Sequence, residues 1–290
     1  MIAKRWRLIG ATIAALFCFA TAEIARGAEF ANPQMVTING YSGDAMEPFI
    51  TRDGNFLFFN NSNSEPDTNL YWATKVDDLT FNFMGEIAGA NSPLLDAVAS
   101  MDLAGDFFFI TTRSYLSSFS TIYQASYAAG AVTDVGLVAG VSKRKLGWVN
   151  FDCEISADGN TLYFLDGFFG NKNFPQKTKW AIAHRSGSAF KRDPKGPSIL
   201  ACCRTGKSLN YAPDTSADEL EFYWTRLIPP TTPPQIWMAT RAGKTKPFKN
   251  AHQITAITGF AEAPSISPDG HSLYFHLLDN DTFKVWRVTR

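Results

Sequence analysis

Short runs of apolar residues, each broken by a polar turn, recur along the chain at a regular spacing. The clearest copies are residues 47–59, 152–164 and 263–275, in which an apolar stretch, an Asp-Gly pair and a second apolar stretch follow one another. Weaker copies begin at Val98 and Ala212, and the aligned turn positions lie 51 to 60 residues apart. Runs rich in aromatic and β-branched residues, bounded by turn formers, predict β-strands.

A second matching segment follows each copy. It has the form of a short strand with a central aromatic residue and occupies residues 70–75, 122–127, 180–185, 236–241 and 285–290. Each unit therefore supplies a strand A, an Asp-Gly turn, a strand B, a variable loop, a strand C and a shorter strand D, such as residues 254–257. Four strands with a period of about 50 residues are typical of a propeller blade.

The last unit stops at Arg290, the end of its strand C, so its fourth strand has to come from elsewhere. Residues 34–42 resemble residues 253–261, which precede the last strand A. We therefore expect residues 35–39 to form the outer strand of the last blade, which would protect a sheet edge. The fold class predicted is all-β: a five-bladed β-propeller, its ring closed by an N-terminal strand that completes the last blade.

The N-terminus has the pattern of an export signal. Lys4, Arg5 and Arg7 precede an apolar run over residues 8–20, and Ala20-Thr21-Ala22 offers small residues to a signal peptidase. We interpret residues 1–22 as a signal peptide, 23–33 as a linker and 34–290 as a single propeller domain in a periplasmic or secreted protein. Cleavage after Gly27 is an alternative. A membrane anchor is another, although the run is shorter than the roughly 20 residues that span a bilayer.

Charge and cysteine content narrow the choice of partners. Without residues 1–22 the chain has 24 Lys and Arg against 27 Asp and Glu, which does not favour nucleic acid. Three cysteines remain, Cys153, Cys202 and Cys203, an odd number that makes a poor disulfide framework. The four histidines are scattered, so we expect no metal site. No cofactor is expected, and the propeller is expected to be a monomer without a membrane span.

Residues 265–275, Ser-Ile-Ser-Pro-Asp-Gly-His-Ser-Leu-Tyr-Phe, and 236–241, Ile-Trp-Met-Ala-Thr-Arg, carry a resemblance to a known family. They resemble the WD40-like (PD40) repeat found in the propeller of TolB, in that of prolyl oligopeptidases and in many exported bacterial proteins. TolB differs in having a further N-terminal domain and six blades. The chain has no Gly-x-Ser-x-Gly nucleophile motif, so the resemblance implies the fold and not peptidase activity.

Strand alternation places the D-to-A connections and the B-to-C loops at the same end of the ring. The Asp-Gly turns lie at the other end, and turn geometry explains them. The residues expected to bind a ligand around the channel mouth are Asp44, Glu47, Arg113, Asn150, Asp152, Asn210, Arg226 and Glu262.

The main hypothesis for function is a non-catalytic module that binds a protein, peptide or glycan of the cell envelope. It rests on a repeat that occupies the whole chain and leaves no catalytic domain. The alternative is a glycoside hydrolase in which Glu47, Asp152 and Glu262 supply the acid and the base or nucleophile. A lyase or lactonase with a central metal is a third possibility. The sequence leaves open which of these holds, and whether the protein is an enzyme at all.

Overall fold

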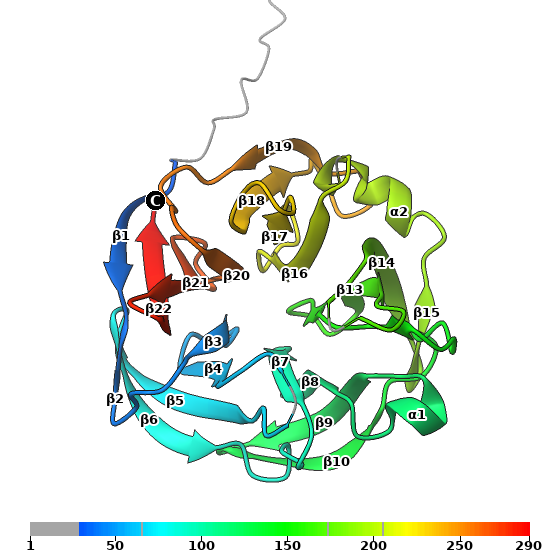
Figure 1. Cartoon of the computed structure of the whole chain (residues 1–290), viewed down its shortest axis with the longest axis horizontal. Coiled ribbons are helices and arrows are strands. Elements are labelled where there is room, and N and C mark those ends of the chain that lie inside the picture. The colour runs from blue at the N-terminus through cyan, green and yellow to red at the C-terminus, as the bar shows by residue number, and fades with distance from the viewer. Residues whose placement is uncertain (1–28, 65, 173, 205) are drawn as a thin grey trace, which may run out of the picture.

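Five small β-sheets stand around a common axis in the computed structural model of the chain, which describes residues 29–290 except 65, 173 and 205 (Figure 1). The predicted signal peptide, residues 1–22, lies outside the described residues. The predicted five-bladed β-propeller is confirmed.

The first two blades each contain one complete repeat of antiparallel strands. From the channel outward, blade 1 contains β3 (Met46–Ile50), β4 (Phe56–Asn60), β5 (Leu70–Asp77) and β6 (Thr80–Glu86). Blade 2 contains β7 (Asp96–Met101), β8 (Asp106–Thr111), β9 (Ile122–Ala128) and β10 (Ala131–Leu137).

The innermost strand of blade 3 is split in two. The blade contains β11 (Trp148–Val149) and β12 (Cys153–Ile155), which both pair with β13 (Thr161–Phe168), and then β14 (Lys177–Ser186) and β15 (Ala189–Arg192). Blade 4 contains β16 (Leu209–Thr215), β17 (Glu221–Leu227), β18 (Gln235–Thr240) and β19 (Lys249–Gln253). The expected outer strand at residues 254–257 is therefore wrong, because β19 ends before them and a turn follows.

The N-terminal segment closes the ring at an earlier register than predicted. Blade 5 contains β20 (Ala261–Ile266), β21 (Ser272–Asp279), β22 (Thr282–Thr289) and, antiparallel to β22, β1 (Ala31–Met35). Residues 35–39 were expected in this position, but β2 (Thr37–Asn39) instead pairs in parallel with β6 of blade 1. The segment therefore connects the last blade to the first, and β1 includes residues 31–33 of the predicted linker.

Apolar layers between neighbouring blades form the core. Phe58 of blade 1 and Phe107 of blade 2 are both fully buried, and their ring centroids lie 5.5 Å apart. Edge-to-face contacts of this kind add to the gain from removing the rings from water. The blades therefore stabilise one another.

Four of the five turns between strands A and B are held by a repeated local hydrogen bond. The hydroxyl of Thr51 donates to Asp53, and those of Ser156, Ser216 and Ser267 donate to the Asp two residues later, at 2.5 to 2.6 Å. The same Asp oxygen accepts a backbone N–H two residues further on. These contacts account for the repeated Asp as a turn former.

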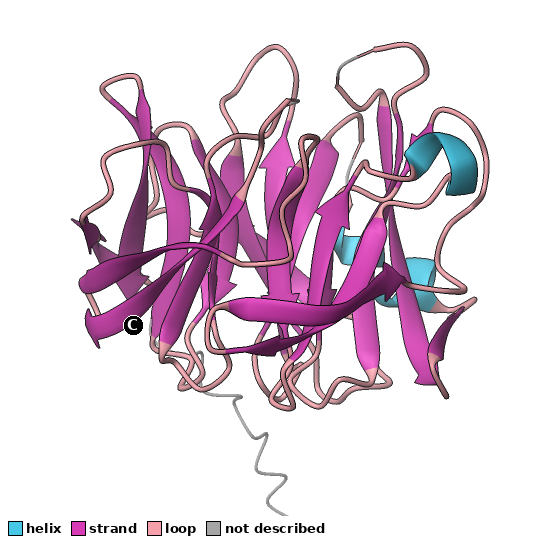
Figure 2. Cartoon of the chain, turned by 90° about the horizontal axis from the view of Figure 1, so that it is seen from below, coloured by secondary structure: helices cyan, strands magenta, loops and turns pink. Residues whose placement is uncertain are grey.

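Figure 2 shows longer loops on one side of the ring and short turns on the other. The helices are single turns, α1 (Tyr115–Ser118), α2 (Gly196–Ile199) and the 3-10 helix η1 (Ala201–Cys203). Within residues 29–290, as far as they are described, no helix is long and apolar enough to cross a membrane. Cys153, Cys202 and Cys203 are free thiols.

Candidate functional site

The innermost strands are kinked where they reach the channel mouth. Glu47, Val98, Ala212 and Ala263 occupy the same repeat position, and each has a positive φ of 48° to 55°. The strand register shifts beside each of them, which is the signature of a β-bulge. In blade 3 the gap between β11 and β12 contains the equivalent residue, Asp152. A bulge changes the direction in which nearby side chains point, and these bulges lie at the residues around the mouth.

Three carboxyl groups from blades 1, 3 and 5 converge at this mouth: those of Glu47, Asp152 and Glu262. Blade 4 holds two of them together, because the Tyr211 hydroxyl donates to Glu262 Oε1 and the N–H of the next residue, Ala212, donates to Asp152 Oδ2 at 2.7 Å. The three residues are only 7%, 4% and 9% exposed. They are the carboxylates that the sequence proposed for a glycosidase.

His276 connects the third member of this cluster. The backbone N–H of Glu47 donates to His276 Nδ1 at 2.9 Å, and His276 Nε2 lies 3.2 Å from Glu262 Oε2. Because Nδ1 accepts a proton donor, the imidazole hydrogen is on Nε2 and points to Glu262. Glu262 thus accepts hydrogen bonds on both oxygens, from Tyr211 and from His276, as a carboxylate can.

Burial and mutual repulsion change the acidity of the other two carboxyl groups. Burial raises the pKa of Glu47 well above its usual range, with further increases from the charges of Asp152 and Glu262 and a smaller opposing effect of the Asn63 hydrogen bond. Burial also raises the pKa of Asp152 to about 7. The hydrogen bond from the Ala212 N–H lowers this pKa, and the charge of Glu262 raises it. Two carboxyl groups with a raised pKa therefore lie beside one that accepts hydrogen bonds on both oxygens.

The loops of blades 1 and 3 cover the cluster. Asn63, in the loop after β4, donates to Glu47 Oε1 at 2.7 Å. On the blade 3 side the ring of Phe151 lies 5.6 Å from that of Phe169 and 6.4 Å from that of Tyr211. An aromatic wall therefore leads from the loop surface to the carboxyl groups.

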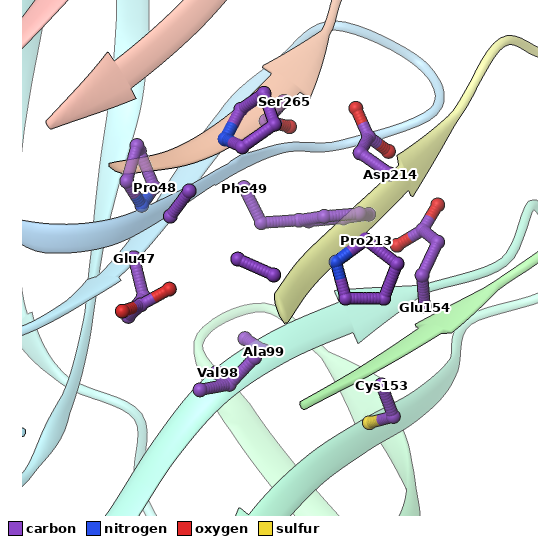
Figure 3. A pocket seen from close by; sticks show the side chains of 13 residues that line it. Glu47, Pro48, Phe49, Val98, Ala99, Cys153, Glu154, Pro213, Asp214 and Ser265 are labelled. Atoms are coloured by element: carbon purple, nitrogen blue, oxygen red, sulfur yellow. The ribbon is translucent and has the colours of Figure 1, made fainter. Parts of the chain in front are cut away.

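Below the mouth the channel narrows to a cavity of about 20 Å³, room for about one water molecule. Figure 3 shows that Glu47 lies on one side of this cavity, and that the carboxyl groups of Glu154 and Asp214 lie on the other side. Arg52 of blade 1 pairs with Glu154 of blade 3 and lies 3.8 Å from Asp214 of blade 4. This deeper group ties the blades together inside the channel.

The other residues predicted to bind a ligand have structural partners. Asp44 Oδ1 accepts the N–H of Phe283 on β22, at 2.8 Å. Arg113 pairs with Asp96 at 2.5 Å. The side-chain amide of Asn150 donates to Leu165 O and Asp166, that of Asn210 accepts from Trp224, and Arg226 lies 4.4 Å from the centre of the Trp237 ring. None of these contacts involves Glu47, Asp152 or Glu262.

Tyr211, His276 and Asn63 were not among the individual residues predicted to bind a ligand. The repeat itself contained the signal for His276, because Asn60 and Thr225 stand at the same position in strand B. They accept the N–H of Val98 and Ala263 in the next blade, at 3.2 and 2.9 Å. A histidine at this polar position, unlike Asn or Thr, can also reach the carboxyl group of Glu262.

A larger hollow, of about 650 Å³, lies between blades 3 and 4. Its buried polar groups bind one another: Tyr163 donates to Glu219 at 2.8 Å, Arg241 donates to Tyr163 at 2.9 Å, and Lys244 pairs with Glu219 at 2.6 Å. These contacts join the two blades. Among the described residues no group of three or more His, Cys, Asp or Glu has an arrangement suited to a metal ion.

No family model matches the sequence, and no curated protein matches it either. Solved structures do share the fold. That of a BT0996 RGII complex has a TM-score of 0.60 at 8% identity, over 88% of this protein and 89% of that one. Zg3597, a family 117 glycoside hydrolase from the marine bacterium Zobellia galactanivorans, has a TM-score of 0.57 at 10% identity, over 90% and 91%.

A thermostable family-43 glycoside hydrolase has a TM-score of 0.56 at 11% identity, over 88% of this protein and 91% of that one. TolB from Acinetobacter baumannii has a TM-score of 0.47 at 15% identity, over 85% of this protein and 55% of that one, too low a similarity to support an argument. The PD40 assignment therefore stays a prediction from sequence. At these identities the comparisons show the propeller fold alone.

Proposed function

We propose that the protein is an exported glycoside hydrolase whose active site is the carboxyl cluster at the channel mouth. The observation that carries this proposal is the convergence of Glu47, Asp152 and Glu262, with the pKa of the first two raised by burial. Both glycosidase mechanisms need a protonated carboxyl group beside an ionised one. A cation-binding site would instead need carboxylates that are ionised at neutral pH.

In this proposal Asp152 is the general acid, because a pKa of about 7 leaves it protonated and still able to release the proton at neutral pH. Glu262 is the general base or nucleophile, positioned by Tyr211 and His276. Glu47 is a third carboxyl group that holds a substrate hydroxyl. The aromatic wall of Phe151 and Phe169 supports sugar binding, and family-43 and family 117 glycoside hydrolases use the same fold. Export rests on the pattern of residues 1–22.

The test is hydrolysis of a panel of aryl glycosides and of plant and algal polysaccharides by the purified protein. We expect release of sugar by the wild type and its loss in Asp152→Asn and Glu262→Gln. Glu86→Gln, an exposed carboxylate on β6, is the matched control and should keep full activity. A wild type that hydrolyses none of these substrates contradicts the proposal.

A second candidate, a non-catalytic binding module for an envelope protein, peptide or glycan, is favoured by one feature of the cluster. Asp152 and Glu47 already bind Ala212 N–H and Asn63, and the cavity beneath is too small for a sugar ring. If the same glycans bind the protein without being cleaved, and Asp152→Asn does not alter their affinity, the binding role replaces the catalytic one.

A further inference from the structure

Two neighbouring loops of blade 3 carry a concentrated positive charge. Residues 141–148, 168–172 and 174–179 contain no Asp or Glu, although the whole chain has equal numbers of acidic and basic residues. Their basic residues are all exposed: Lys143, Arg144, Lys145, Lys172, Lys177 and Lys179. The nearest carboxylate in sequence, Asp166, is buried and is shared between Arg192 and Lys143. We call this surface, together with α1, the basic rim.

Large apolar side chains project from the same rim. Leu116 on α1 is 83% exposed, Leu146 is 67% exposed and Phe174 is 60% exposed. Three large exposed apolar side chains beside a cluster of cations mark a surface that contacts something other than water.

Hydrogen bonds hold these loops as one surface. The hydroxyl of Tyr115, next to Leu116, donates to Trp148 O at 3.1 Å and accepts the Gly147 N–H at 2.9 Å. The N–H of Phe169 donates to Gly147 O at 2.9 Å, and that of Gln176 donates to Phe168 O at 2.7 Å. These bonds therefore connect α1 and the two loops of blade 3 to one another.

A tryptophan forms the centre of the rim. Trp148 packs on Phe168 with ring centroids 5.3 Å apart, and Lys143 Nζ lies 3.8 Å from the centre of the Trp148 ring. Amphipathic aromatic rings beside lysines suit the boundary between lipid headgroups and acyl chains.

We propose that the basic rim binds the surface of an anionic phospholipid membrane. Leu116, Leu146 and Phe174 enter the headgroup layer, and the six cations lie against the lipid phosphates. An acidic polysaccharide would attract the same cations, but it offers no apolar layer for the leucines and Phe174. The inference does not depend on the proposed hydrolase activity.

The test is cosedimentation of the protein with phosphatidylcholine vesicles, with and without phosphatidylglycerol, at low and high salt. All variants carry the same N-terminus, so residues 1–28 contribute equally. We expect binding only to the anionic vesicles and its loss at high salt. Lys145→Glu with Lys177→Glu should weaken binding at least about tenfold, and Leu116→Ser with Leu146→Ser should also weaken it.

Matched controls are available outside the two loops and α1 that form the basic rim. Leu103→Ser removes a leucine that is 66% exposed in the turn after β7. Lys191→Glu with Lys249→Glu makes the same charge change on the outer strands β15 and β19. Both controls should bind like the wild type, and thermal unfolding checks that every variant is folded.

Three results would overturn the proposal. One is a wild type that does not bind anionic vesicles, and another is a loss of binding in the controls as large as in the rim variants. The third is binding of soluble polygalacturonate that the leucine variants leave unchanged, with no preference for vesicles, which would assign the rim to an acidic polysaccharide.

Discussion

The guanidinium of Arg52, from the first A–B turn, forms a buried ion pair with Glu154 on the innermost strand of blade 3. Their side chains are 4% and 2% exposed. Arg52 also donates to Thr215 O at 3.1 Å and Ile155 O at 3.0 Å, while Ser100 donates to the other oxygen of Glu154. One side chain of blade 1 thus contacts blades 3 and 4 across the channel.

Arg52→Met should therefore destabilise the ring strongly. The substitution leaves Glu154 and Asp214 buried without their cation, a situation that costs about 3–5 kcal/mol. Burial raises the pKa of Asp214 to about 6, although the charge of Arg52 lowers it. The loss of stability should therefore be smaller at low pH, because protonation of Asp214 removes a buried charge that has lost its cation. Urea unfolding measures it. Lys75→Met, which breaks an exposed pair with Asp78, should change stability by less than about 1 kcal/mol, and an equal loss in both contradicts the interpretation.

His276 should be replaceable by Asn but not by Phe. His276→Phe leaves the N–H of Glu47 buried without an acceptor, which costs about 1–3 kcal/mol in the free energy of unfolding. His276→Asn keeps an acceptor, because Asn60 accepts the equivalent N–H in blade 1. Thermal unfolding of both variants measures the difference. Equal destabilisation by Asn and Phe would contradict the role of His276 as the acceptor of the Glu47 N–H.

Stability should fall as the pH rises from about 4 to 7. An unfolded Asp loses its proton near pH 4, whereas burial keeps Asp152 protonated in the fold until about pH 7. Over this interval the folded state binds more protons, so the free energy of unfolding decreases with pH, by on the order of 4 kcal/mol for this residue.

Asp152→Asn should remove this contribution, because Asn mimics the protonated acid and can still accept the Ala212 N–H. The difference in unfolding free energy between pH 5 and pH 8, measured in urea, should be smaller in the variant than in the wild type. Asp281→Asn, at an exposed position, serves as the control. Identical pH profiles for wild type and Asp152→Asn would contradict the raised pKa.

Ring closure should depend on Phe30, just before β1. Its ring is 7% exposed, lies 6.2 Å from that of Tyr223 and is covered by Arg290 at 4.7 Å. Phe30→Ala should lower the unfolding free energy by about 3 kcal/mol. Met35→Ala, at the other end of β1 and 49% exposed, should have little effect. Calorimetric melting temperatures test both, and an unchanged Phe30→Ala would show that the segment is dispensable for closure.

The sequence alone determined the number of blades, the strand order and the position of the A–B turns. These features depend on local chemistry: alternating apolar residues form strands, and a Ser or Thr two residues before Asp fixes four of the five turns. The closing segment was predicted to pair with the last blade, but at the wrong register. Short strands lie on both sides of Val36, and only the edges presented by β22 and β6 decide which of them pairs with each blade.

The candidate site, too, was determined partly by the sequence and partly by the tertiary structure. The repeat placed Glu47 and Asp152 at one equivalent position and Glu262 one residue before that position, all three near the channel mouth, because the start of each strand A meets the others at the axis. Their acidity and their partners were decided only by the tertiary structure. Tyr211 reaches Glu262 from blade 4, His276 links Glu262 to the backbone of blade 1, and burial acts on a carboxyl group only after five sheets have closed around it. A linear repeat specifies its own blade, whereas electrostatics at the axis depends on all five together.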